Sequence, residues 1–157
     1  MFIYLILMKN IFTKEVSDEV IARVNSLTSE TQPHWGKMNV AQMLVHCSVA
    51  YEGVYTDKHP KPNAFTKFML KLFVKKAVVS EKPYPKNSRT APQFLITDER
   101  VFEEEKGKII DYINKTQELG AAHFDGKESH SLGKLTINEW NNLFYKHIDH
   151  HLNQFGV

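Results

Sequence analysis

The apolar residues of this chain recur at steps of three and four, which is the spacing that an α-helix needs to bury one face. Val16, Val20 and Val24 show this spacing at the start of the chain, within a stretch that runs from Lys14 to about Leu27. We find no convincing alternating strand pattern, no internal repeat and no glycine-rich phosphate loop. The pattern therefore predicts an all-α fold of four main helices and one accessory helix. The later helices are predicted at 39–55, 64–79, about 98–119 and 136–155.

Capping residues mark where several of these helices begin. Asn39 is followed three positions later by Gln42, and Thr136 is followed by Glu139 in the same way. This spacing is typical of a capping box, in which the two side chains satisfy free backbone N–H groups at a helix start. A proline-rich loop over 80–92 is long enough to cover a pocket. The remaining connectors are predicted at 29–37, 56–63 and 121–135.

Length and composition predict a single globular domain over 1–157. The 157 residues carry 20 Lys and Arg against 18 Asp and Glu, a formal net charge of +2. Such a weak charge does not favour nucleic acid as a partner, because nucleic-acid binding rests on many phosphate contacts. The single cysteine excludes an intrachain disulfide and a thiolate zinc site. A reducing compartment, the cytoplasm, fits this cysteine usage best.

The first eight residues, Met1 to Met8, are almost entirely apolar. They are too few to span a membrane, and Lys9 interrupts them with no basic region before them. We treat 1–12 as an N-terminal extension, and two interpretations of it remain. Either it is a packed N-terminal segment, or the start lies upstream of the native one and Met8 is the native first residue. We favour the second.

A row of lysines lies on the predicted helix over 64–79. Lys67, Lys71, Lys75 and Lys76 occupy the face opposite its apolar residues. Such a row can contact anionic lipid or nucleic acid, but it is more often a solvated helix face. From the sequence we therefore expect neither a membrane nor a nucleic-acid partner.

Histidines on the last predicted helix are the main chemical signal. His147 and His151 are four residues apart and share a face with Trp140 and Phe144, so both rings should point inward. His147 with His150 is the competing pair. Two histidines four apart are a weak metal motif by themselves, and a third ligand is required.

His46 is the candidate for that third ligand, because it lies on the apolar face of the predicted helix over 39–55. Three neutral imidazoles bind zinc at about 2.0–2.1 Å and leave a fourth position open for water or substrate. The alternative is that each histidine is a core residue with its own hydrogen bond. Burying three imidazoles without a common purpose costs hydrogen bonds, which favours shared coordination. Zinc suits this set best, and nickel, iron and manganese also fit.

Several longer motifs resemble a known family. They are the segment Trp35–Cys47, then His130, Gly133 and Trp140, and the closing run 147–156. Together these resemble the DinB-like superfamily, and more narrowly its branch DUF1569, a domain of unknown function. The resemblance covers the chain from about residue 31 to its end.

This resemblance implies a DinB-like four-helix bundle of the up-down-down-up type, with an accessory helix between helices 2 and 3 and often a homodimer. It implies a metal held by one histidine of the second helix and two of the last, which here are His46, His147 and His151. Some superfamily members are metal-dependent thiol S-transferases, and related members include a maleylpyruvate isomerase. The narrower branch implies no particular reaction.

We therefore expect a metal-dependent enzyme that activates a water or a small-molecule thiol for hydrolysis or S-transfer. The alternative is a non-catalytic metal-binding or ligand-binding helical module. If thiol chemistry occurs, the thiol should arrive with a small-molecule substrate, since Cys47 is expected to be a small core residue.

The remaining polar residues are given more limited roles. Gln42, Glu52, Gln154 or a backbone carbonyl should accept a hydrogen bond from a ligand imidazole. Asp149 should point away from the site. His130 is expected to anchor its loop. The other histidines, His34, His59 and His123, are expected at the surface.

Overall fold

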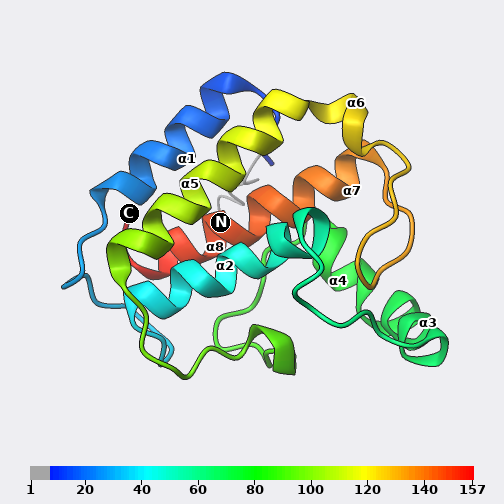
Figure 1. The fold of residues 1–157 in the computed structure, drawn as a ribbon, viewed down its shortest axis with the longest axis horizontal. Coiled ribbons are helices and arrows are strands. Elements are labelled where there is room, and N and C mark those ends of the chain that lie inside the picture. Colours follow the sequence, from blue (N-terminus) through cyan, green and yellow to red (C-terminus); the bar gives the residue numbers. More distant parts are fainter. Residues whose placement is uncertain (1–7) are drawn as a thin grey trace, which may run out of the picture.

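Helices account for nearly all regular structure in the computed structural model, which describes residues 8–157 (Figure 1). Over these residues no strand forms, and one isolated bridge joins Glu128 to Lys134. The all-α prediction is confirmed. None of the helices there is both long and apolar enough to cross a membrane. The elements are α1 (Lys14–Ser26), α2 (Val40–Tyr55), α3 (Ala64–Phe73), α4 (Lys75–Val79), η1 (Pro92–Phe94), α5 (Phe102–Leu119), α6 (Ala121–Phe124), α7 (Ile137–Asn141), η2 (Asn142–Lys146) and α8 (His147–Gln154).

Four helical runs surround one apolar core. Helix α2 packs against α5 and α8, and α1 packs against the same two helices. Figure 1 shows that α1 and the run from α7 to α8 point in one direction, whereas α2 and α5 point in the other. Large side chains from each run are fully buried between them, among them Val20, Leu44, Ile113 and Phe144. The last run is continuous from α7 to α8 and contains a π-helical turn, η2.

Both predicted capping boxes are present. The Asn39 side chain accepts a hydrogen bond from the backbone of Gln42 at 2.9 Å, and the Gln42 side chain accepts one from the backbone of Asn39. Thr136 and Glu139 form the same reciprocal pair at the start of α7. These bonds satisfy N–H groups that have no partner within the helix, so the starts of α2 and α7 are fixed by local sequence.

Three helix predictions differ from the structure. The predicted helix over 64–79 is two helices, α3 and α4, which meet at Val74. Helix α5 begins at Phe102 and not near 98, and Val101 before it is exposed. Three glutamates follow in the first turn of α5, where negative charge is favourable at a helix start. The predicted loop after Gly120 contains the short helix α6.

The predicted N-terminal extension over 1–12 lies partly outside the described residues. Its apolar run over 1–7 lies entirely outside them. The part that is described packs on the core. Ile11 is fully buried, and its backbone N–H donates to the side chain of Asn141 at 2.8 Å. The same Asn141 donates back to the carbonyl of Lys9 at 2.9 Å. Residues 9–12 are therefore joined to the start of the last helical run.

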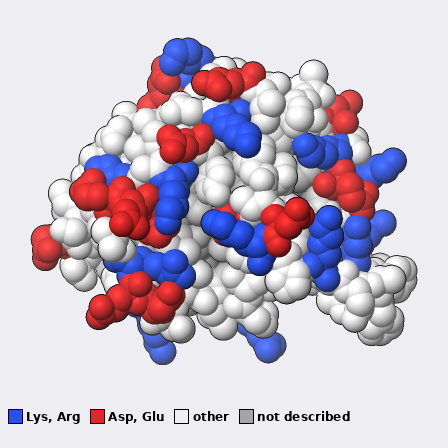
Figure 2. Space-filling view, viewed as in Figure 1, with Lys and Arg blue, Asp and Glu red and all other residues white. Residues whose placement is uncertain are grey.

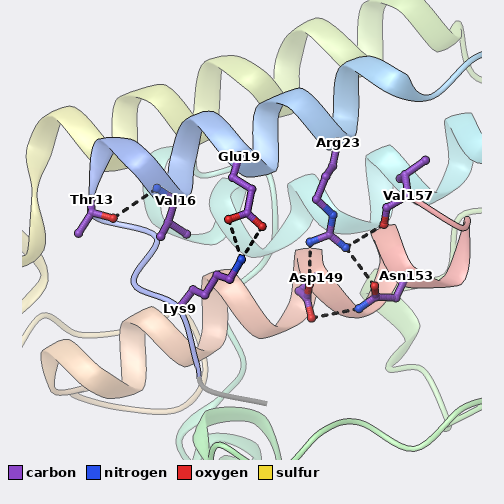
Figure 3. Close-up of polar contacts among 8 residues, drawn as sticks. All are labelled: Lys9, Thr13, Val16, Glu19, Arg23, Asp149, Asn153 and Val157. Carbon is purple, nitrogen blue, oxygen red and sulfur yellow. Dashed lines mark hydrogen bonds and ion pairs between the residues drawn. The ribbon is translucent and has the colours of Figure 1, made fainter. Parts of the chain in front are cut away.

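An arginine joins α1 to the end of the chain (Figure 3). The guanidinium of Arg23 donates to Asp149 at 2.7 Å, to Asn153 at 3.1 Å and to the carbonyl of Val157 at 2.9 Å. Asn153 donates in turn to Asp149 at 3.1 Å. The side chains of Arg23 and Asp149 are only 18% and 21% exposed, so water screens this pair less than it screens a surface pair.

We predict that Arg23→Met lowers the free energy of unfolding by roughly 1–3 kcal/mol, because it leaves Asp149 and the Val157 carbonyl without their cation. Urea denaturation followed by circular dichroism measures this change. Lys14→Met is the matched control, since its pair with Asp18 is open to solvent and should contribute about 0.5 kcal/mol or less. Equal losses in the two variants would contradict the prediction.

Candidate metal centre

Three histidines from two helices converge inside the molecule. His46 lies in the middle of α2, and His147 and His151 lie one turn apart at the start of α8. The ligand nitrogens that they offer all lie within 4.8 Å of one another. The ring centroids are 4.5 to 5.0 Å apart. The sequence analysis predicted that these three residues lie together, and the packing of α2 on α8 brings them together.

The ring of His46 is oriented by a backbone carbonyl. Its Nδ1 lies 2.8 Å from the carbonyl oxygen of Phe94, which can only accept a hydrogen bond. The proton of a neutral His46 therefore lies on Nδ1, and Nε2 carries the lone pair. This Nε2 faces the cluster, 3.0 Å from Nε2 of His147.

The ring of His151 is oriented by a glutamine. Its Nδ1 lies 2.7 Å from Oε1 of Gln154. The Nε2 of the same amide donates to the carbonyl of Trp35 at 2.6 Å, so the amide oxygen must face His151. His151 therefore donates from Nδ1 and keeps a lone pair on Nε2. Outer partners that fix a ligand histidine in this way are typical of metal sites.

Hydrogen bonding among residues 8–157 leaves two ring nitrogens of the cluster without a partner, Nδ1 of His147 and Nε2 of His151. His147 Nε2–H can donate to Nε2 of His46, and the 3.0 Å separation fits such a bond. Over residues 8–157, no donor is within hydrogen-bond distance of Nε2 of His151. A tetrahedral zinc ion would engage all three lone pairs, with nitrogens about 3.3 Å apart. The observed separation of 3.0 Å between His46 and His147 is close to this value, and all three ligand atoms lie within 4.8 Å of one another.

Burial keeps the three imidazoles uncharged. His46 and His151 are 5% and 8% exposed. Desolvation lowers the pKa of His46, whereas the Phe94 carbonyl opposes this shift. It lowers the pKa of His147 well below its usual value, and the neighbouring imidazoles add to the effect. The pKa of His151 falls to about 3 for the same two reasons, desolvation first. Neutral imidazole is the form that binds metal.

Aromatic side chains cover the cluster. The ring of Phe94 lies 5.3 Å from that of His46 and 5.9 Å from that of His147, and the ring of Tyr84 lies 6.4 Å from His147. Tyr84 belongs to the loop that was predicted to cover a pocket, and Phe94 belongs to the short turn η1 that follows it. The role of Phe94 was missed, because an aperiodic loop gives no signal about where its residues pack.

The π-helical turn η2 comes directly before His147 and supplies a second residue that sequence reasoning missed. Lys146 is 5% exposed, and its ammonium group donates to the carbonyls of Ala77, Ser80 and Lys82. It also lies 4.3 Å from the centre of the Tyr84 ring. Desolvation lowers the pKa of Lys146 to about 8. Turns of this type are frequent at functional sites, and here one holds the covering loop.

A family model described as "Protein of unknown function (DUF1569)" matches residues 9–156. The chain belongs to the DUF1569 family. The match contains all three clustered histidines as well as the segments that orient and cover them. No match was found among curated proteins or among solved structures.

The other histidines of the DUF1569 chain lie outside the cluster. His150, the competing partner of His147, packs against the rings of Trp35 and Tyr84. Trp35 is half-buried there. His130 lies 3.1 Å from the carbonyl of Pro60, which agrees with a loop-anchoring role. As predicted, His34 and His123 are exposed, whereas His59 is half-buried and paired with Glu52.

The remaining predictions near the site have mixed outcomes. Of the proposed acceptors, Gln154 and a backbone carbonyl serve the cluster, whereas Gln42 caps α2 and Glu52 binds Lys58. Cys47 is fully buried, and its thiol lies 3.7 Å from the sulfur of Met43. Asp149 points away from the cluster toward Arg23, as expected.

None of the three clustered histidines lines either of two surface hollows of the protein. One, of about 190 Å³, is lined by Trp35, Tyr84, Lys86 and His150 among others, so it adjoins the cluster through His150. The other, of about 330 Å³, lies at Gly53 and His130.

We predict that the metal-free protein loses stability as the pH falls below about 6.5. His151 has a folded pKa of about 3, so between this value and about 6.5 the unfolded chain binds a proton that the folded chain does not. The contribution of His151 is therefore fully present above about 6.5. It is lost at about 1.4 kcal/mol for each pH unit below that value.

Urea denaturation in the presence of chelator, repeated between neutral and mildly acid pH, measures this loss. The variant His151→Asn should show a shallower pH dependence than the wild-type chain. His123→Asn changes an exposed ring outside the cluster and should keep the wild-type dependence. Identical slopes for the wild-type chain and His151→Asn would contradict the prediction.

Proposed function

We propose that this DUF1569 protein is a metal-dependent enzyme in which His46, His147 and His151 hold a divalent transition metal. The observation that carries the proposal is the convergence of three neutral imidazoles within 4.8 Å, two of them oriented from behind by acceptors. Zinc suits an all-imidazole site best, and nickel, iron and manganese fit the same ligands. Three protein ligands leave a coordination position open, which is the arrangement of catalytic sites.

The chemistry proposed is hydrolysis or S-transfer. A divalent metal at this site lowers the pKa of a water or thiol and so supplies a nucleophile at neutral pH. The chain's own part is to orient the rings through Gln154 and the Phe94 carbonyl, and to exclude bulk water with the rings of Phe94 and Tyr84. The thiol would come from a small-molecule substrate, since Cys47 is buried and burial raises its pKa.

We also propose that the fold is the DinB-like four-helix bundle of the up-down-down-up type. The directions of α1, α2, α5 and the run ending in α8 support this arrangement (Figure 1). Helices α3 and α4 would then be the accessory unit between the second and third helices. The superfamily resemblance implies a homodimer, and the single buried cysteine fits a cytoplasmic location.

A non-catalytic metal-binding or ligand-binding module is the second candidate. It is favoured by one observation, namely that neither surface hollow reaches the ring nitrogens of the cluster. The two candidates share the histidines and differ in whether a small substrate gains access to them.

We predict close to one transition-metal ion per chain in protein produced without a chelating tag. His147→Ala should abolish this content, because two imidazoles alone hold zinc weakly. Gln154→Met should weaken metal affinity by about 10- to 100-fold, because it removes the acceptor that orients His151. Mass spectrometry of the purified protein measures the content, and competition with a chromogenic chelator measures the affinity.

The matched control is His130→Ala, which removes a histidine outside the cluster and should keep the full metal content. Chelator should also lower the melting temperature of the wild-type chain, because metal binding stabilises the folded state. Metal-free wild-type protein, together with melting that is insensitive to chelator, would contradict the proposed metal centre.

The reaction is tested on the metal-loaded protein with small thiols and electrophilic acceptors, followed by the loss of free thiol. Turnover should disappear in His147→Ala and persist in His130→Ala. A fully metal-loaded protein that transfers no thiol and hydrolyses no ester or amide would favour the non-catalytic module.

A further inference from the structure

The apolar face of α3 is open to solvent. Phe65, Phe68, Leu72 and Phe73 are each at least 60% exposed, and no residue of this helix is buried. Large apolar side chains grouped in this way mark interaction surfaces, whereas single exposed ones do not. We call these four side chains the α3 apolar face.

Helix α3 projects from the body of the protein. Among the elements of residues 8–157, α4 is the one that it contacts (Figure 1). Its lysines are turned toward the body: Lys67 pairs with Glu128, and the side chain of Lys71 lies against Gly133. These lysines lie on the opposite side of the helix from the apolar face. The apolar face therefore points away from the protein.

The sequence segment that contains α3 is rich in lysine, although the chain as a whole is nearly neutral, and three of these lysines pair with glutamates outside the segment. Residues 58–89 contain eight lysines and one arginine against a single glutamate, a formal charge of +8. The rest of the chain must then carry −6 to give the total of +2. Figure 2 shows the uncharged lobe formed by α3 with lysine and arginine side chains beside it.

We infer that α3 is a docking surface for an anionic lipid membrane. The α3 apolar face would enter the boundary between headgroups and acyl chains. The exposed Lys61 and Lys76, which form none of the ion pairs of residues 8–157, would contact lipid phosphates. A basic amphipathic helix with aromatic and leucine side chains on one face is the kind that lies in this boundary. From the sequence, the lysine row favoured a solvated face, and the outward apolar face changes that interpretation.

Charge favours lipid over the other occupants. A second copy docked through the same face would bring together two segments of +8 each, which repel one another. Nucleic acid would use the lysines but would leave the leucine and phenylalanine side chains in water. An anionic membrane satisfies both the charge and the apolar face. The inference is independent of the metal centre, so either can fail alone.

Flotation of the full chain with lipid vesicles tests the inference. We expect binding to vesicles of equal parts phosphatidylcholine and phosphatidylserine, and little binding to phosphatidylcholine alone. Raising the salt concentration should weaken it, because salt screens lysine from lipid phosphate. The double variant Phe68→Ser with Phe73→Ser should bind at least about tenfold more weakly, since two large apolar side chains no longer enter the membrane.

Matched variants separate the contribution of α3 and its lysines to vesicle binding from the effect of changing any exposed side chain. Val101→Ser changes a valine that is 59% exposed outside α3 and should leave binding unchanged. Lys76→Gln should weaken binding about fivefold, whereas Lys37→Gln, outside the basic segment, should not. Circular dichroism should show every variant folded, because all these side chains are exposed.

Three outcomes would overturn the inference. They are no binding to anionic vesicles, equal binding to both vesicle types, and unchanged binding of the double variant. Sedimentation equilibrium identifies the competing occupant. A dimer of the wild-type chain that becomes a monomer in the double variant, without vesicle binding, would make α3 a contact between copies.

Discussion

The uncharged state of three desolvated imidazoles is the constraint on which the site depends. A neutral imidazole has one donor and one acceptor, and burial makes each of them costly to leave unpaired. His46 and His151 use their donors on partners outside the cluster, the Phe94 carbonyl and Gln154. Their two lone pairs then face a space where His147 can offer a single proton. No arrangement of the protons among the rings satisfies both lone pairs, whereas a cation bound by the three Nε2 atoms would, with the proton of His147 on its Nδ1.

The grouping of His147 with His151 was predictable because it depends on helix periodicity. Residues four apart on a helix share a face wherever the helix lies, so His147 and His151 were paired from their spacing. His46 followed from its place in an apolar stripe, together with the resemblance to a family pattern. The competing pair with His150 could be resolved only by the structure, which packs that ring against Trp35 and Tyr84. The capping boxes were predictable for the same local reason.

Features that depend on partners outside the local sequence were not predictable. The amphipathic pattern of α3 would be the same whether its apolar face packed against the core or faced solvent. In the structure this face is exposed to solvent. The break at Val74 follows from tertiary contacts, since α4 is held to the body through buried Val79 and the pair between Lys75 and Glu139. Phe94 lies in a loop with no periodicity, so nothing in the sequence placed it over His46.

The two segments that cover the cluster, the loop with Tyr84 and the turn η1, are held by different numbers of hydrogen bonds. This difference affects how a small molecule would reach the cluster. Three carbonyls around Lys146 fix the end of α4 and the start of the loop that carries Tyr84. The η1 turn is held on the cluster through the bond between the Phe94 carbonyl and Nδ1 of His46. Movement of η1 would uncover the rings and also remove the acceptor that orients His46. Access to the cluster and the orientation of the His46 ring are thus linked through a single hydrogen bond, because the same residue supplies the cover and the acceptor.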